Sequence, residues 1–478
     1  MTAPAALRMT AEDFASLAAC RPSPAALRVL RDGQVSRRLL TLKSVADAAR
    51  AAVPEFWDTH GAAAWDLCLL ARRADVRAFE GVLLHPHVGV WLGRCLRALD
   101  GPHPAAAASV DLARMGGLAA AAALRAGLRP ELVLPAPGSL LWLPTFGDVR
   151  LSEGAEAAGL RGDVLEWGGR SWVIVGRREE AAAQDTACDT PRRLTVPSRA
   201  GAPALSVVLE DGDLYRDAHG HPVLPRQTAG QLRVWQMSVA AAWDVVTRMV
   251  PERTAACAAL WTALVPLRPP RTGQGASSSA REAYGAIAAS FTADPVRLAE
   301  TVVHESAHIA FGALADLTDL VDPDDRTLQK VGWRDDARPV GSVLTGTHAH
   351  LALLEFWRRR RRELTGGQAR VASARLHHYG RQVADALRIL QAHPALTPMG
   401  ARFVEIMADE AERCGFPVRR LSSARPGGPS HVRVASRGTQ HLTRRHTATS
   451  AAQGVAGLAC RTGGWGGKTA DDTTPGAG

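Results

Sequence analysis

The stretch ETVVHESAHIAFGALADL, residues 300–317, contains two histidines four residues apart, with Glu305 directly after the first of them. An α-helix turns once in about 3.6 residues, so His304 and His308 should lie one turn apart on the same face, while Glu305 should lie about 100° around the helix. Two imidazoles at this HExxH spacing can share one metal ion. The stretch therefore predicts a helix that carries a metal centre.

The surrounding residues predict where this helix begins and which face is buried. Asp294 can cap the free backbone N–H groups, and Pro295 suits the first helical position. Two histidines could instead satisfy only local hydrogen bonds, but the small Ser306 and Ala307 between them allow close packing around an ion. Apolar residues at helical spacing predict a buried stripe: Leu298, Val302, Ile309, Ala313 and Leu317.

The histidine pair alone does not select a reaction. A zinc peptidase would use Glu305 as general base toward a metal-bound water and would need a third protein ligand. The extended HExxHxxGxxH pattern is absent because Phe311 and Leu314 stand at its last two defined positions, which leaves Glu355 as a downstream candidate. An iron(II) oxygenase would need three protein ligands and open positions for its cosubstrate and oxygen.

A second segment, VGWRDDARPVGSVLTGTHAHLALLEFW (331–357), supplies further candidates. His350 opens an apolar helical stretch and is a plausible third ligand, with His348 as its rival. Arg334 and Arg338 suggest a carboxylate-bearing cosubstrate, since a guanidinium matches a carboxylate with two hydrogen bonds. The alternative is that these arginines pair with neighbouring aspartates.

Composition limits the partners and the location of the protein. The net charge of +10 is concentrated in residues 419–478, which hold nine Lys/Arg against two Asp and so leave only +3 for the rest. This argues against a nucleic-acid partner. We find no run of about 18 apolar residues that would predict a membrane span, and no basic start followed by an apolar segment typical of a signal peptide. The seven cysteines form no CxxC pair, and we expect reduced thiols in a cytoplasmic protein.

The order of compositions predicts an α-rich α+β protein. Residues 1–130 show helical periodicity and should form a helical N-terminal region, and 131–227 contain short β-type runs that suggest a small antiparallel sheet. Residues 228–418 should form a helical metal-binding core, with a loop at VPLRPPRTGQGASSSAREAYG before the metal helix. The basic, Gly- and Ser-rich tail, 419–478, is predicted to be disordered.

The combination of AETVVHESAHIAFGALADL, WRDDARPVGSVLTGTHAHLALLEFW and VPLRPP...SSSAREAYGAIAASF resembles the HEXXH motif domain family. The resemblance extends to RLLTLKSVADAAR and VLLHPHVGVWLGRCLRAL and spans most of residues 10–415. Members of this family occur around ribosomally made, post-translationally modified peptides and are regarded as 2-oxoglutarate-dependent peptide β-hydroxylases. The paired motifs are far more specific than HExxH alone.

The resemblance implies Fe(II) bound by His304, His308 and His350. It implies that Glu305 binds the metal or orients a ligand histidine. The candidates for binding the carboxylates of 2-oxoglutarate are Arg334, Arg338 and, in the loop before the metal helix, Arg281.

The implied reaction hydroxylates Cβ of a residue in a precursor peptide, converting 2-oxoglutarate and oxygen to succinate and carbon dioxide. We expect other peptide-modifying enzymes of the same pathway as partners. We do not expect the protein to bind nucleic acid or a membrane. Two alternatives stay open: a zinc metallopeptidase, for example one that removes a leader peptide, and a peptide-binding module that keeps a metal only for its structure.

Overall fold

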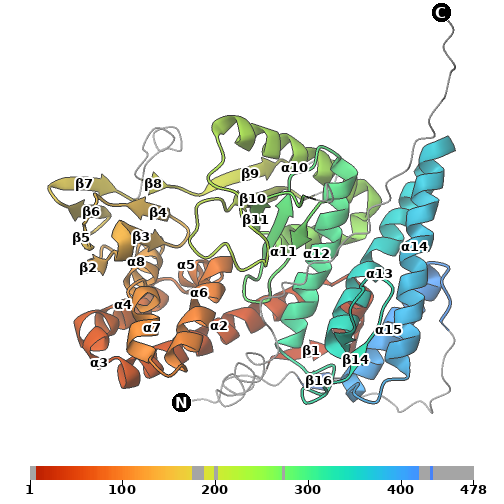
Figure 1. The fold of residues 1–478 in the computed structure, drawn as a ribbon, viewed down its shortest axis with the longest axis horizontal. Helices are drawn as coiled ribbons and strands as arrows, with labels where there is room; N and C mark the ends of the chain where they lie inside the picture. Colours follow the sequence, from red (N-terminus) through yellow and green to blue (C-terminus); the bar gives the residue numbers. More distant parts are fainter. Residues whose placement is uncertain (1–6, 175–187, 199–202, 272–274, 419–430, 434–478) are drawn as a thin grey trace, which may run out of the picture.

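The computed structural model describes residues 7–174, 188–198, 203–271, 275–418 and 431–433. These residues form an α-rich α+β protein, as the sequence predicts (Figure 1). The predicted disordered tail, 419–478, lies outside the described residues except for His431–Arg433. Those three residues form strand β16, which pairs antiparallel with β1, Arg8–Thr10, near the start of the chain.

The N-terminal region is helical, as expected. Its longest helix, α2, is capped at its start by the side chain of Ser23, and its Gly33 faces Leu317, just beyond the end of the helix that carries the HExxH motif. A stretch over Pro104–Arg125 is apolar enough to cross a membrane, but most of it is buried inside the protein, which is typical of a core helix of a soluble protein. The helices are α1 (Ala11–Ala18), α2 (Pro24–Ala52), α3 (Pro54–Phe56), α4 (Ala62–Ala74), α5 (Val76–Leu83), α6 (Pro86–Leu99), α7 (Pro104–Leu112) and α8 (Met115–Arg125), with a π-helical turn at Trp57–Gly61.

Two small antiparallel sheets follow and pack on α8, on the left in Figure 1. Buried side chains alternate with more exposed ones along strands such as Ala157–Arg161. The first sheet has the order β2-β5-β6-β7 and the second β3-β4-β8. The bounds are β2 (Glu131–Pro135), β3 (Leu140–Leu143), β4 (Gly147–Arg150), β5 (Ala157–Arg161), β6 (Val164–Trp167), β7 (Arg170–Val173) and β8 (Cys188–Asp189).

A third, five-stranded sheet lies at the centre of the molecule and corrects the predicted organisation. Its order is β12-β13-β11-β10-β9, with parallel pairing among β13, β11 and β10. The predicted boundary at residue 227 cuts through this sheet, and part of the predicted loop is strand. The sequence pattern missed β11 and β13 because every residue in them is buried, so neither shows alternation. The strands are β9 (Arg192–Val196), β10 (Leu205–Leu209), β11 (Ala263–Leu267), β12 (Ser277–Ser278) and β13 (Ala286–Ser290).

Of the remaining helices, α10 and α12 pack against this sheet, and the later ones pack beyond α12 at the right of Figure 1. Helix α10 begins with a capping box between Thr228 and Gln231. Helix α12, which carries the HExxH motif, begins where the sequence predicts, with the Asp294 side chain accepting from the backbone N–H of Val296. The bounds are α10 (Ala229–Met249), α11 (Thr254–Leu260), α12 (Pro295–Ala315), α13 (Val340–Glu363), α14 (Gly366–Gln391) and α15 (Pro398–Arg413), with short strands β14 (Leu328–Gln329) and β15 (Arg338–Pro339) between α12 and α13.

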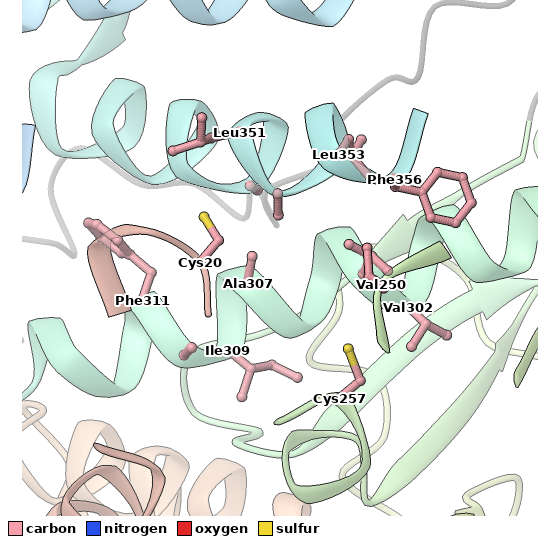
Figure 2. Close-up of a cluster of buried hydrophobic side chains, with 14 of the residues drawn as sticks. Cys20, Val250, Cys257, Val302, Ala307, Ile309, Phe311, Leu351, Leu353 and Phe356 are labelled. Atoms are coloured by element: carbon pink, nitrogen blue, oxygen red, sulfur yellow. The ribbon is translucent and has the colours of Figure 1, made fainter. Parts of the chain in front are cut away.

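Helix α12 is buried on almost all sides, which makes it the centre of the larger hydrophobic core. Figure 2 shows Ala307 and Phe311 of α12 below Leu351 and Leu353 of α13, with Cys257 of α11 on the other side of α12. A polar side chain on this helix therefore has little access to water. Each of its histidines and glutamates must find a partner within the protein.

Candidate metal centres

The histidine pair of α12 has the geometry of two ligands to one ion. The Nε2 atoms of His304 and His308 lie 3.1 Å apart in the buried interior. Two nitrogens that each bind a metal at about 2.0–2.1 Å, with an angle between a right angle and the tetrahedral value, lie roughly 2.8–3.4 Å apart. The helix has thus brought the two nitrogens to the separation that a shared metal ion requires.

Helix α13 directs its two histidines to different places. The ring of His350 lies 5.2 Å from that of His304 and is held between Trp333 and Tyr379. His348, two residues earlier, points away from the pair and makes a 2.8 Å hydrogen bond to the carbonyl oxygen of Leu17. Between these two rivals, the structure brings only His350 beside His304.

Burial keeps these imidazoles neutral. Loss of hydration lowers the pKa of His304 and of His308 well below the usual value, and lowers the pKa of His350 to about 3. A metal binds the neutral form of histidine, so the site needs no deprotonation step at neutral pH.

Glu305 is held by two serines of the sheet edge. Ser277 Oγ donates to its Oε1 and Ser279 Oγ to its Oε2, each at 2.9 Å. Burial raises the pKa of Glu305 to about 7, although both hydrogen bonds favour the charged form and oppose this shift. The carboxyl group is therefore close to half protonated at neutral pH.

Glu300 belongs to the site and was not predicted. It precedes His304 by one turn on the same face of α12, and its Oε1 accepts hydrogen bonds from Trp357 Nε1 at 3.0 Å and Tyr379 Oη at 2.8 Å. Burial raises the pKa of this carboxyl. The i, i+4, i+8 spacing of Glu300, His304 and His308 was a readable signal, since such residues share one helix face.

A cavity of about 110 Å³ reaches the histidines between α12 and the sheet. Polar groups line it on the sheet side, while His304 and His350 form part of its wall with Tyr379 and Glu300. The cavity is the route by which a small molecule would reach a metal held here. Its other lining residues are Pro269, Gly275, Ala276, Ser277, Ser290, Phe291, Thr292, Arg297, Leu298, Thr301 and Leu353.

The three arginines predicted to bind the cosubstrate are all engaged in ion pairs. Arg281 Nε donates to Asp316 at 2.7 Å, and Arg334 and Arg338 both contact Asp336, at 3.0 and 2.9 Å. None of the three lines the 110 Å³ cavity. The cation that does line it is Arg297, one turn before Thr301 on α12, which the sequence reading overlooked.

Glu355, the alternative third ligand, is also engaged elsewhere. Its carboxylate pairs with Arg358 at 2.6 Å and with Arg359 at 3.3 Å on the same helix. This side chain therefore neutralises part of the basic run that ends α13.

A second group of metal-binding side chains lies apart from the α12 histidines. His85 Nε2 lies 2.9 Å from Glu210 Oε1, and His87 Nδ1 lies 3.2 Å from Asp213 Oδ1. One ligand atom from each of the four lies within 4.8 Å of the other three, and the group could hold a metal ion. The ligand atoms of His304, His308 and His350 do not all lie within 4.8 Å of one another, so His350 would have to move closer for these three residues to share one ion.

The charges of this second group support one another. Burial by itself lowers the pKa of His85, but the Glu210 carboxylate outweighs it, and the pKa is raised. Burial alone would raise the pKa of Asp213, but His87 and His85 hold it below its usual value. In the sequence, the signals for this group were the HPH motif at 85–87 and the acidic EDGD run at 210–213, which are too far apart to be connected without the fold.

No protein-family model matches the chain, and no curated protein matches it. The function is therefore inferred from the geometry and chemistry of the two sites.

Proposed function

We propose that the protein is an iron(II)- and 2-oxoglutarate-dependent hydroxylase that acts on Cβ of residues in a ribosomally made precursor peptide. The observation that carries this proposal is the 3.1 Å pairing of the His304 and His308 Nε2 atoms, with the His350 ring beside them at the wall of the 110 Å³ cavity. Three imidazoles on one side and an accessible cavity on the other suit an oxygenase, which needs open metal positions.

His304, His308 and His350 would hold the iron, which together with 2-oxoglutarate and oxygen supplies the oxidising chemistry for replacing C–H by C–OH. The chain contributes orientation and the exclusion of water. Trp333 and Tyr379 fix the ring of His350 from two sides, and Glu300 fixes Tyr379 through a 2.8 Å hydrogen bond. A change at Glu300 should therefore act on the metal centre through His350.

Arg297 is the residue we assign to the cosubstrate. It lines the cavity together with Ser290 and Thr292, so a dicarboxylate bound at the iron could reach a guanidinium and hydroxyl groups at its far end. Arg281, Arg334 and Arg338 already have carboxylate partners, and binding a cosubstrate would require breaking those pairs.

The peptide has a binding edge next to the cavity. Strand β12 is the outer strand of the five-stranded sheet, and its Ser277 lines the cavity. An extended peptide that pairs with a sheet edge places alternate side chains on one face, so a single Cβ could be presented to the metal. Enzymes of the same modification pathway are proposed as further partners.

A zinc metallopeptidase is the second candidate, and Glu305 is the observation that favours it. A pKa of about 7 suits a general base near neutral pH. Against it, both carboxylate oxygens accept hydrogen bonds from serine hydroxyls, which orients them toward the sheet edge. A hydroxylase needs no such base, so the hydroxylase is the better fit.

The test uses the metal-free protein under anaerobic conditions with Fe(II) and 2-oxoglutarate. We expect a weak visible charge-transfer band from the keto acid on iron, and we expect His304→Ala and His350→Ala to lose it. Arg297→Met should bind 2-oxoglutarate at least about tenfold more weakly, because a charge-assisted pair is lost. His348→Ala, on the same helix as His350, is the matched control and should keep the band.

On admission of oxygen, succinate should form in proportion to 2-oxoglutarate consumed. Absence of the band together with peptide cleavage under nitrogen that requires zinc and Glu305 would instead establish the peptidase.

A further inference from the structure

Four buried side chains from distant parts of the chain meet where α6 begins: His85 and His87 on one side, and Glu210 and Asp213, which follow β10, on the other. We propose that these four residues form a second metal centre, structural in role, that binds Zn²⁺ or a similar divalent cation. This inference stands independently of the proposed hydroxylase function.

The donor set and its spacing fit a tetrahedral ion. Two imidazole nitrogens and two carboxylate oxygens are ligands that zinc accepts, and ligand atoms around it lie roughly 3.3 Å apart when each bond is about 2.0–2.1 Å long. The measured pairs, 2.9 Å between His85 and Glu210 and 3.2 Å between His87 and Asp213, are close to that value. Small shifts of the remaining pairs would complete the coordination.

His87 supplies an independent indication of a ligand. It is fully buried, and neither of its ring nitrogens makes a hydrogen bond with a described residue, although Nδ1 is 3.2 Å from Asp213 Oδ1. A buried polar group without a hydrogen bond costs free energy, about 1–3 kcal/mol by mutational measures. A metal ion between His87 and Asp213 would satisfy both groups.

Charge balance also favours a cation. Glu210 and Asp213 are both buried, and their two negative charges would be neutralised by one divalent ion while both imidazoles stay neutral. Asp213 is held in place for this role because Oδ2 accepts from Trp142 Nε1 at 3.0 Å and Oδ1 accepts from the backbone N–H of Tyr215 at 2.7 Å. Such supporting hydrogen bonds orient metal ligands.

The surroundings indicate a structural site. The cavity lined by His85, Glu210 and Asp213 measures only about 10 Å³, the room that one water molecule needs. No organic substrate fits there. The ion would instead connect α6 of the N-terminal helical region to the end of β10 in the central sheet, two segments that are more than a hundred residues apart in the sequence.

The experiment measures bound zinc. The full chain is freed of metal with a chelator, saturated with Zn²⁺, desalted and analysed for metal by mass spectrometry. We expect two equivalents in the wild type. Glu210→Gln and His87→Gln should each retain one equivalent of zinc. Loss of a hydrogen bond that supports a ligand weakens metal affinity roughly ten- to hundred-fold, and loss of a ligand itself should weaken zinc affinity at the changed site by more than this.

Two further proteins separate this site from the α12 centre. The double variant His304→Ala, His308→Ala should retain one equivalent of zinc, and zinc should still raise the melting temperature of this variant. Zinc should raise the melting temperature of Glu210→Gln less than it raises that of the wild type. Asp217→Asn, which removes an exposed carboxylate paired with Arg94, is the matched control and should retain two.

The proposal is overturned if Glu210→Gln and His87→Gln bind as much zinc as the wild type, or if the α12 double variant binds none. If the α12 centre takes no zinc, the wild type should hold one equivalent, and Glu210→Gln should lose it. Should His87→Gln fail to fold, Glu210→Gln decides, because glutamine keeps the hydrogen bond to His85 and removes only the charge.

Discussion

Glu305 is protonated over an unusual pH range. Its pKa is about 7 in the folded, metal-free protein because burial penalises the carboxylate, whereas an unfolded chain has the ordinary glutamate value near 4.3. Between these two values the unfolded state has lost its proton and the folded state has kept it. Stability must therefore fall as pH rises through this window and level off above about 7.

Glu305→Gln should remove this pH dependence. Glutamine resembles the protonated acid, so the variant should match the wild type near pH 4, below both pKa values, and be more stable at pH 8, by about 3–4 kcal/mol at most. Urea unfolding of the metal-free proteins at both pH values measures the difference. If the stability difference between variant and wild type is the same at pH 8 as at pH 4, burial does not destabilise the carboxylate.

His348 and His350 show how two similar residues acquire different roles. They are two positions apart on α13, so their side chains point about 200° apart around the helix. One donates to Leu17 in the packing against α1, and the other lies beside His304. The direction of each follows from the helix, but which direction leads to α12 depends on packing.

At the scale of elements, α12 and α15 tolerate a methyl group very differently. A Cβ added to Gly312 of α12 would meet nothing within 4 Å, while one added to Gly400 of α15 would lie 1.7 Å from the carbonyl oxygen of Leu320. Gly400 is thus required for the close approach of α15 to the chain that follows α12.

Gly312→Ala should stabilise the protein by about 0.5–1 kcal/mol, because alanine loses less backbone entropy in a helix. Gly400→Ala should destabilise it by about 1–3 kcal/mol or more, since the overlap forces the helix to move. Denaturant midpoints of the two variants measure this contrast directly. Equal effects at the two positions would contradict the close packing of α15.

At the scale of the whole molecule, Arg38 joins segments that are distant in sequence. It is buried, and its Nη1 donates to the carbonyl oxygens of Leu83 and His85, each at 2.7 Å, while Nη2 lies 3.4 Å from the carbonyl oxygen of Glu282. The guanidinium therefore holds α2, the turn before α6 and the chain before β13 together. It also fixes the backbone of His85, one of the four residues that could hold a metal ion.

Arg38→Met should destabilise the fold by about 1–3 kcal/mol for each carbonyl left without a donor. Arg38→Lys should recover only part of this loss, because one ammonium group does not reproduce the planar fork. Arg402→Met, at an exposed residue paired with Glu405, is the control and should change stability by less than about 1 kcal/mol. An Arg38→Met protein as stable as this control would contradict the joining role.

The sequence by itself determined the features that depend on neighbours along the chain. Asp294 and Pro295 marked the start of α12, the 3.6-residue repeat placed His304 and His308 on one face, and short β-type runs predicted strands such as β2 and β10. These signals are local because helix caps, helix faces and half-buried strands depend on residues a few positions apart.

Only the tertiary structure decided the rest. The position of His350, rather than His348, beside His304, the pairing of Arg334 and Arg338 with Asp336, and the burial that hides β11 and β13 all depend on what packs against each element. The same holds for the group of His85, His87, Glu210 and Asp213, whose halves are more than a hundred residues apart. No local pattern encodes such contacts, because they form only when folding brings separate segments together and removes water from between them.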